Sequence, residues 1–233
     1  MKQFFKNAKY SLPAAIMLLI GCRDESLNPN KPWEPGVHAL GVFDGVAETA
    51  KANFATNAKT FPLTGQDNSK IDFKIRWVTL DNILTVSKII VKIDMIESYT
   101  DPDGNPKTVS LGSGGRIVKT IEAPAANRQW NMFSITPAEI YTLYKDATVK
   151  YDKVNAVKVF ENPARPRPAG ARLQGPQVVA GKTVANADAF VVTWELTTTD
   201  GSVFKVWNEE SICLDPTPVS QANSNCRLNF SVK

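Results

Sequence analysis

The sequence predicts an all-β fold, namely an immunoglobulin-like antiparallel β-sandwich with one short crossover helix. Three observations support this prediction. Hydrophobic and polar residues alternate over several short stretches, turn-forming residues separate those stretches, and only one stretch carries clear helix signals. Alternation with a period of two places one face of a strand in a core. The 233 residues, 43% of them hydrophobic, suffice for one domain with a sizeable core.

Residues 1–21 have the features of a secretory signal peptide. Lys2, Lys6 and Lys9 give a positive start without an acidic residue, and Leu12 to Ile20 form a short apolar run. The run is too short to span a bilayer, which takes about 20 apolar residues. We therefore expect an exported chain.

Cys22 follows directly after this apolar run. The segment from Leu19 to Cys22 resembles the bacterial lipobox, in which a small residue before the cysteine permits cleavage and the thiol receives a diacylglycerol. The resemblance implies a mature protein that begins at a lipidated Cys22 and is anchored to a membrane. The alternative is an ordinary cleaved signal followed by a chance cysteine.

The residues after Cys22 indicate where the anchored protein resides. Arg23, Asp24 and Glu25 resemble the signal that exports lipoproteins of Bacteroidota to the outside of the outer membrane. An anchor facing the periplasm, or a merely solvated charged tether, is the alternative. Residues 22–40 are polar and contain several prolines, so we expect a lipid-anchored tether, followed by a single sandwich domain over 41–233.

Several stretches are predicted to be strands. Residues 41–69 show no clear period, and their structure is left open. Asp200 and Gly201 indicate a hairpin between two of the expected strands. The expected strands are Ile71 to Trp77, Ile89 to Met95, Arg116 to Glu122, Val154 to Phe160, Phe190 to Leu196, Val203 to Trp207 and Arg227 to Val232, with a fragment at Val178 and Val179.

Residues 134–145 are expected to form the single helix. Thr136 suits the N-cap, Pro137 suits the first helical position, and Glu139 completes a capping box. Ile135 and Ile140 are placed to form a hydrophobic staple across this start. A helix this short is expected to cross between the two sheets.

The segment Asp101 to Pro106 has two interpretations. Oxygens at Asp101, Asp103 and Asn105 resemble the start of a calcium loop, but Pro106 stands where such a loop needs glycine. A hairpin turn explains the sequence better. We expect neither a metal nor another cofactor here.

A proline- and glycine-rich segment, Glu161 to Asp188, is long for a connection inside a compact domain. Such segments are either solvated loops or binding loops. Arg165, Arg167 and Arg172 lie within it, and arginines pair well with carboxylates of a partner. We identify these three arginines as a candidate partner loop.

The charge balance and the rarity of histidine restrict the function classes. The chain has 27 basic and 23 acidic residues, and removal of the signal peptide leaves 24 against 23. A near-neutral chain has little electrostatic basis for binding nucleic acid. His38 is the only histidine, without a second histidine for zinc or an obvious nucleophile nearby. We identify no catalytic residues.

Two cysteines remain once Cys22 carries lipid. Because export leads to an oxidising compartment, we expect Cys213 and Cys226 to form a disulfide. The bond would tie the last strand to the preceding hairpin.

The segment FVVTWELTTTDGSVFKVWNEESIC, from Phe190 to Cys213, carries a family resemblance. A strand ending in Thr-Thr-Asp-Gly, a returning Val-Phe strand and then a cysteine resemble the C-terminal part of β-sandwich surface lipoproteins beside SusC/SusD-type transport systems. The resemblance covers about a quarter of the chain. It implies no catalytic motif.

Two functions therefore remain open. The first is an accessory subunit of an outer-membrane protein complex, engaged in transport or protein biogenesis. The second is a glycan-binding module of a polysaccharide-uptake system, with Trp130 and Trp207 as candidate platforms. Trp77 and Trp194 lie on strand faces that we expect to be core.

Overall fold

The computed structural model describes residues 36–47, 58–79, 82–163, 165, 172–179, 181–205 and 226–233. All of them belong to one compact unit, Pro35–Lys233. The first strand, β1 (His38–Phe43), begins inside the segment that was expected to be tether. The boundary predicted at residue 41 is therefore corrected, because Ala39 already lies in the core with none of its surface exposed.

One sheet has three antiparallel strands in the order β1-β3-β7. The central strand is β3 (Ile71–Val78) and its other neighbour is β7 (Trp130–Ile135). Alternate residues of β3 are buried, as the period of two predicts. The register places Arg76 opposite Trp130 and Lys74 opposite Met132, so these four side chains share the outer face.

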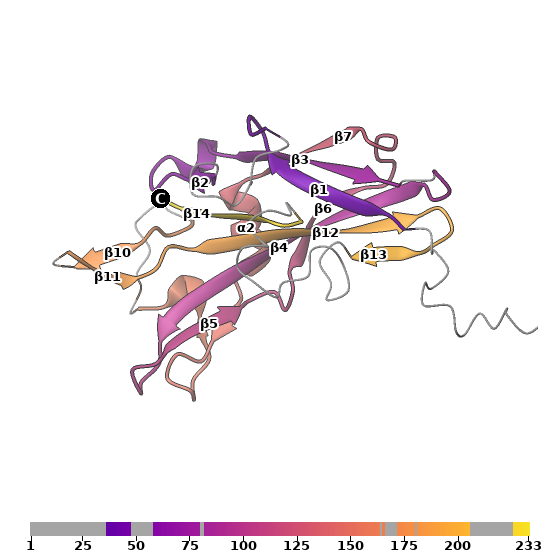
Figure 1. Ribbon diagram of the computed structural model, residues 1–233. Helices are drawn as coiled ribbons and strands as arrows, with labels where there is room; N and C mark the ends of the chain where they lie inside the picture. Colours follow the sequence, from indigo (N-terminus) through magenta and orange to yellow (C-terminus); the bar gives the residue numbers. More distant parts are fainter. Residues whose placement is uncertain are drawn as a thin grey trace, which may run out of the picture. The chain divides into compact units, whose positions relative to one another are not determined.

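The second sheet has seven strands. Its central pair is β4 (Val86–Thr100) and β12 (Ala189–Thr198), which run antiparallel, with β12 paired to residues 86–96 of β4 (Figure 1). β2 joins β14 in parallel, whereas the other pairings are antiparallel. The remaining members are β2 (Thr60–Phe61), β5 (Pro106–Ser110), β6 (Arg116–Ile121), β13 (Val203–Lys205) and β14 (Leu228–Val232).

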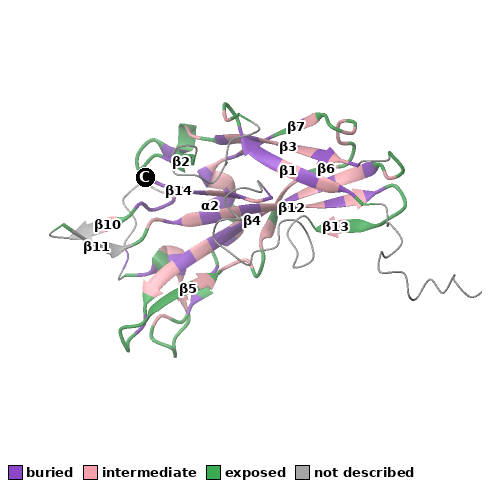
Figure 2. Ribbon diagram, in the orientation of Figure 1, coloured by how far each residue is buried: buried purple, intermediate pink, exposed green. Residues whose placement is uncertain are grey.

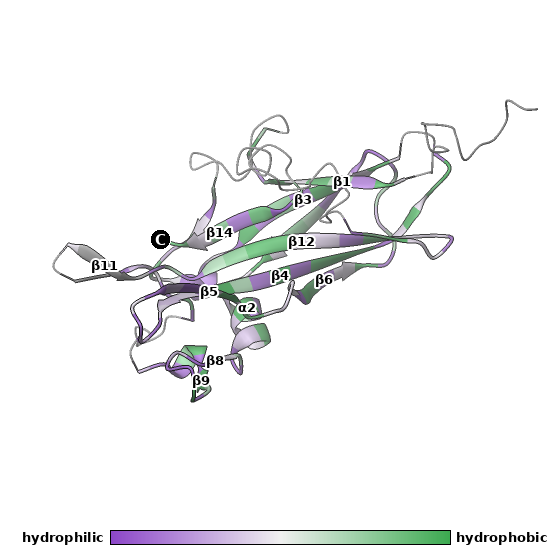
Figure 3. Ribbon diagram, turned by 60° about the horizontal axis from the view of Figure 1, so that its bottom comes forward, coloured by the Kyte–Doolittle hydropathy of each residue, from purple (hydrophilic) through white to green (hydrophobic). Residues whose placement is uncertain are grey.

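The two sheets pack face to face around one hydrophobic core. Gly41 of β1 lies against Trp194 of β12, and a Cβ added at Gly41 would be 2.5 Å from the indole ring. Figure 2 shows buried residues along the facing strands, and Figure 3 shows hydrophobic and hydrophilic residues along β4. Trp77 and Trp194 are both buried, as expected. The chain is an all-β sandwich with one short helix, as the sequence predicts.

The helix α2 (Pro137–Tyr144) begins with the predicted capping box. Thr136 Oγ1 accepts a hydrogen bond from the Glu139 N–H at 3.3 Å, and Glu139 Oε2 accepts one from the Thr136 N–H at 2.9 Å. Ile140 and Tyr144 are buried, and the Tyr144 hydroxyl donates to the Ile93 carbonyl at 2.6 Å. The helix therefore packs against the large sheet.

Short elements complete the fold. Thr148–Val149 pairs with Val157–Lys158, and a 3-10 turn follows at Val159–Glu161. The strand predicted over residues 154–160 is thus only two residues long, because the chain turns at residue 159. These elements are β8 (Thr148–Val149), β9 (Val157–Lys158), β10 (Gln177–Val179), β11 (Lys182–Ala185), η2 (Gln66–Asn68) and η3 (Val159–Glu161).

The turn between β4 and β5 agrees with the hairpin interpretation of residues 101–106. Asp101 Oδ1 accepts hydrogen bonds from the N–H groups of Asp103 at 3.0 Å and Asn105 at 2.8 Å. Gly104 has φ 82, a left-handed conformation that glycine adopts at little cost. The Asp101 carboxylate therefore organises its own turn.

Candidate functional site

Arg165, which we expected to contact a partner, is instead bound inside the domain. Its side chain is 6% exposed, and Nη1 lies 2.9 Å from Oε2 of Glu97. Nη2 lies 3.1 Å from Oδ1 of Asp188, whose side chain is fully buried. The expectation for Arg165 is therefore wrong. The planar guanidinium group can pair with two carboxylates at once. Here it places a positive charge beside both buried side chains, Glu97 and Asp188.

Tyr151 adds to this buried cluster. Its hydroxyl lies 3.0 Å from Oε1 of Glu97. Burial raises the pKa of Glu97, although the positive charge of Arg165 opposes the shift. Burial, followed by the negative charge of Glu97, raises the pKa of Tyr151. The tyrosine therefore stays neutral, and its hydroxyl donates a hydrogen bond to the Glu97 carboxyl.

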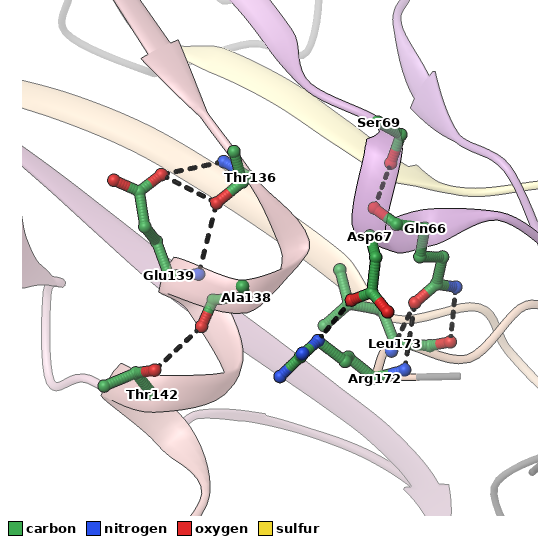
Figure 4. Close-up of polar contacts among 9 residues, drawn as sticks. All are labelled: Gln66, Asp67, Ser69, Thr136, Ala138, Glu139, Thr142, Arg172 and Leu173. Atoms are coloured by element: carbon green, nitrogen blue, oxygen red, sulfur yellow. Dashed lines mark hydrogen bonds and ion pairs between the residues drawn. The ribbon is translucent and has the colours of Figure 1, made fainter. Parts of the chain in front are cut away.

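The later part of the same segment is also attached to the domain. The buried Gln66 side chain accepts from the N–H groups of Arg172 at 3.0 Å and Leu173 at 2.9 Å (Figure 4). Its amide donates to the Leu173 carbonyl at 2.8 Å. Arg172 Nε lies 2.8 Å from Oδ1 of Asp67 at the surface. Of the three candidate arginines, Arg165 and Arg172 have partners within the chain, and Arg167 lies outside the described residues.

Several other predicted site residues lie outside the described residues and stay predictions. They are Cys22, Arg23, Asp24, Glu25, Trp207 and Cys213. Cys226 is described and fully buried. Because Cys213 lies outside the described residues, the predicted pairing of the two cysteines also stays a prediction. Among described residues, no helix is long and apolar enough to cross a membrane.

Trp130 is the predicted aromatic whose surroundings the structure describes. It begins β7 and is partly exposed. Lys74 Nζ and Arg76 Cζ each lie 4.7 Å from its ring centroid, which is within cation–π range. Met132, the next outward residue of β7, is 57% exposed. We call Lys74, Arg76, Trp130 and Met132 the docking face.

Lys74 and Arg76 are the two basic residues of the docking face. Asp72, on the same side of β3, has its carboxylate 2.9 Å from Lys70 Nζ, and this partner lowers its pKa. Tryptophan, arginine and methionine are enriched at protein interfaces, where they supply large contact areas. The same tryptophan has a ring on which a sugar could stack, but the two cations occupy positions over that ring.

Metal binding and catalysis by histidine find little support in the described part of the chain. No group of three or more His, Cys, Asp or Glu residues there could hold a metal ion. Burial lowers the pKa of His38, so its imidazole is neutral at pH 7.

Sequence reasoning found Trp130 but missed the strand that presents it. In β7 the inward position Asn131 is polar and the outward positions Trp130 and Met132 are large, which reverses the usual pattern. Asn131 is satisfied inside, because its Oδ1 accepts from the Ala125 N–H at 2.8 Å. Lys74 and Arg76 could be recognised in the sequence as outward residues of a strand. That Trp130 and Met132 lie beside them follows only from the pairing of β3 with β7.

Comparisons with known proteins add no assignment. No protein-family model matches the chain, and no curated protein matches it either. Among solved structures, the chain is similar to a protein from Bordetella pertussis titled ApaA, with 10% identity over 76% of this chain and 90% of that one. The TM-score is 0.20, which is too low to support an argument about fold or function.

Proposed function

We propose that this chain is a non-enzymatic, lipid-anchored surface protein that acts as an accessory subunit of an outer-membrane protein complex. The lipobox-like Cys22 and the following Arg23, Asp24 and Glu25 support the location, and the SusC/SusD-associated resemblance supports the class. An anchored domain is confined to the membrane plane, where partner complexes lie.

The observation that carries the proposal is the docking face. It combines a partly exposed tryptophan, two cations and an exposed methionine on the outer face of a sheet. Burial of such a group against a partner supplies apolar contact, and the cations select acidic surfaces. The proline-rich segment supports this proposal less than the sequence suggested, because Arg165 and Leu173 are buried parts of the domain.

Native copurification tests this function. The tagged full-length chain is purified from detergent-solubilised membranes of its host, beside a Trp130→Ala/Met132→Ala variant. We expect the wild type to retain membrane proteins and the variant to lose them roughly tenfold or more, because truncation of an interface tryptophan commonly costs about 2 kcal/mol. Val203→Ala, an equally exposed apolar residue on the other sheet, is the matched control.

Two outcomes would overturn the proposal. The double variant could copurify at wild-type yield while its thermal unfolding matches the wild type. Alternatively, the wild type could copurify with nothing and be retarded in a polysaccharide affinity gel, with Trp130→Ala migrating freely. The glycan-binding function would then take its place, since Trp130 is a candidate for both.

Protease treatment of intact cells tests the surface location separately. Added protease should remove the domain from wild-type cells, and alanines at Arg23, Asp24 and Glu25 should protect it. Degradation of the wild type only after lysis would place the domain in the periplasm.

A further inference from the structure

A cavity of about 430 Å³ lies on the outer face of the large sheet, which is the face turned away from the core. Outward residues of two neighbouring strands line it. Lys92 of β4 lies opposite Thr193 of β12, and Asp94 lies opposite Val191. The volume is within the range of small-molecule sites, which is about 300–1,000 Å³. The docking face belongs to the other sheet, so the cavity is a separate feature.

Two opposite charges border this cavity in close contact. Lys92 Nζ lies 2.7 Å from Oε1 of Glu195, and the two side chains are only 24% and 19% exposed. This contact uses one of the N–H donors of the ammonium group and one of the carboxylate oxygens. Partly buried charges are screened less than surface charges. The pair therefore provides both a cationic and an anionic contact for a ligand.

Ser113 and Gly114, in the loop between β5 and β6, also line the cavity. Both have positive φ, 50 and 97, although Ser113 is not a glycine. Asp94 fixes the loop, because its carboxylate accepts from the Ser110 hydroxyl at 2.6 Å and from the Gly112 N–H at 2.9 Å. Strained residues of this kind are concentrated at functional and ligand-binding sites.

The same loop carries hydrogen-bond donors that the fold does not use. Within the described part of the chain, the N–H groups of Ser113 and Gly114 have no hydrogen-bond partner. Gly115 lies against Lys92, since a Cβ added at this glycine would be 3.1 Å from the Lys92 Cβ. The loop therefore borders the cavity on the side of Lys92. Backbone N–H groups beside an ammonium group suit a carboxylate.

We propose that this cavity binds a small zwitterion with an apolar group, as in a free apolar amino acid. The ligand carboxylate pairs with Lys92 and the loop N–H groups, and the ligand ammonium group pairs with Glu195. The apolar group lies against Ile96 and Val191. This binding goes beyond the proposed docking function and does not depend on it.

The charges around the cavity favour a zwitterion over a ligand of one sign. A lone anion would lie beside Glu195 and a lone cation beside Lys92, and like charges in contact are unfavourable. Lys205 and Arg227 also border the cavity, but both have other contacts within the chain and are not assigned to the ligand.

L-Leucine serves as the probe, in calorimetric titration of the full-length chain in detergent. We expect one site with a Kd of about 1 mM or tighter. N-acetyl-leucine lacks the ammonium group and leucinamide lacks the carboxylate, so each should bind roughly tenfold more weakly or worse. Glycine should also bind roughly tenfold more weakly or worse, because it lacks the apolar group.

Two variants assign the ends of the ligand. Glu195→Gln should weaken leucine roughly tenfold and leave N-acetyl-leucine unchanged, whereas Lys92→Gln should weaken leucine and leave leucinamide unchanged. A purely structural role would weaken every ligand alike. Lys88→Gln is the matched control, since Lys88 is also a lysine of β4 but pairs with Glu122 outside the cavity lining. Unchanged thermal unfolding shows that each variant is folded, and the ligand series on the wild type tests the site without any variant.

Three results would overturn the zwitterion site. Leucine could fail to bind, N-acetyl-leucine or leucinamide could bind as tightly as leucine, or Glu195→Gln could weaken leucine and N-acetyl-leucine equally. None of these results bears on docking, because Trp130 and Met132 lie on the other sheet. The Trp130→Ala/Met132→Ala variant should accordingly bind leucine as the wild type does.

Discussion

Arg165 forms ion pairs with two buried side chains, those of Glu97 and Asp188. A buried ion pair is weak evidence for stability, because desolvation offsets its attraction, but removal of one partner is costly. Arg172 provides the contrast, since its pair with Asp67 is exposed on both sides. The two arginines therefore differ in their contribution to the stability of the fold, although both lie in the same proline-rich segment of the sequence.

We expect Arg165→Ala to lower the free energy of unfolding by about 3–5 kcal/mol, because the buried carboxylates of Glu97 and Asp188 would both lose their ion pair with this guanidinium. Arg172→Ala should cost about 0–1 kcal/mol, as an exposed pair does. Urea unfolding followed by tryptophan fluorescence measures both. Equal losses for the two variants would contradict the assignment of Arg165 to the interior.

The stability of the domain should also depend on pH through Glu97. Its pKa in the folded domain is raised above the usual 4.5, chiefly by burial. The folded state therefore binds this proton more tightly than the unfolded state. The corresponding stability is present below pH 4.5 and is lost as the pH rises through the raised pKa.

Glu97→Gln removes this titration. The difference in unfolding free energy between wild type and variant should fall as the pH rises from 4.5 toward neutrality. Unfolding in urea at several pH values measures it. A difference that stays constant or grows over this range would show that the carboxyl is not protonated more readily in the folded state.

The start of α2 is fixed by its capping box. Thr136 and Glu139 satisfy each other's backbone N–H groups, whereas Thr142, within the helix, only donates to the Ala138 carbonyl (Figure 4). Thr136→Ala should cost about 1 kcal/mol. Thr142→Ala should be close to neutral in the same thermal unfolding series, and a larger loss for Thr142→Ala would refute the cap.

A disulfide is expected at the C-terminal strand. Cys213 and Cys226 would close a loop of about 14 residues, which the chain-entropy model values at about 3 kcal/mol. Thiol titration of unfolded, unreduced full-length protein should detect neither cysteine. Two reactive thiols would disprove the pairing and would leave the full burial of Cys226 to packing alone.

Elements with regular alternation were predictable from the sequence, and irregular ones were not. β3, β12 and the helix lie where their patterns predict. β1 was missed because Gly41 interrupts its apolar face, and that glycine makes sense only once Trp194 is known to lie opposite. β7 was missed because Asn131 occupies an inward position.

The candidate site was less predictable than the fold, because it depends on contacts between distant residues. Arg165 and Glu97 are 68 residues apart, so no local pattern announces their pairing. Likewise, Trp130 was identified as a candidate glycan platform, but the cations over its ring belong to β3, and their position depends on the register between the strands. The types of side chain indicated that a binding surface exists, but only the strand order and register showed which residues form it.

In the whole molecule, the residues that stabilise the sandwich are different from those that we propose contact a partner. The segment from residue 161 to 188 contributes buried residues, including Leu173 and Gln174, and so belongs to the folding unit. The docking face contributes mostly partly exposed side chains on the outer side of one sheet. Deletion of residues 165–174 would therefore test folding, whereas substitutions at Trp130 and Met132 test binding.

Attachment to the membrane is expected to depend on Cys22. The apolar run before Gly21 and Cys22 predicts that Cys22 carries lipid. Several acyl chains hold a protein far more firmly than one, because each buried CH₂ contributes about 0.8 kcal/mol. Labelled palmitate should enter the wild type and not Cys22→Ala, and the variant should leave the membrane fraction. Arg23→Ala is the control that keeps the thiol, and equal labelling of wild type and Cys22→Ala would disprove the anchor.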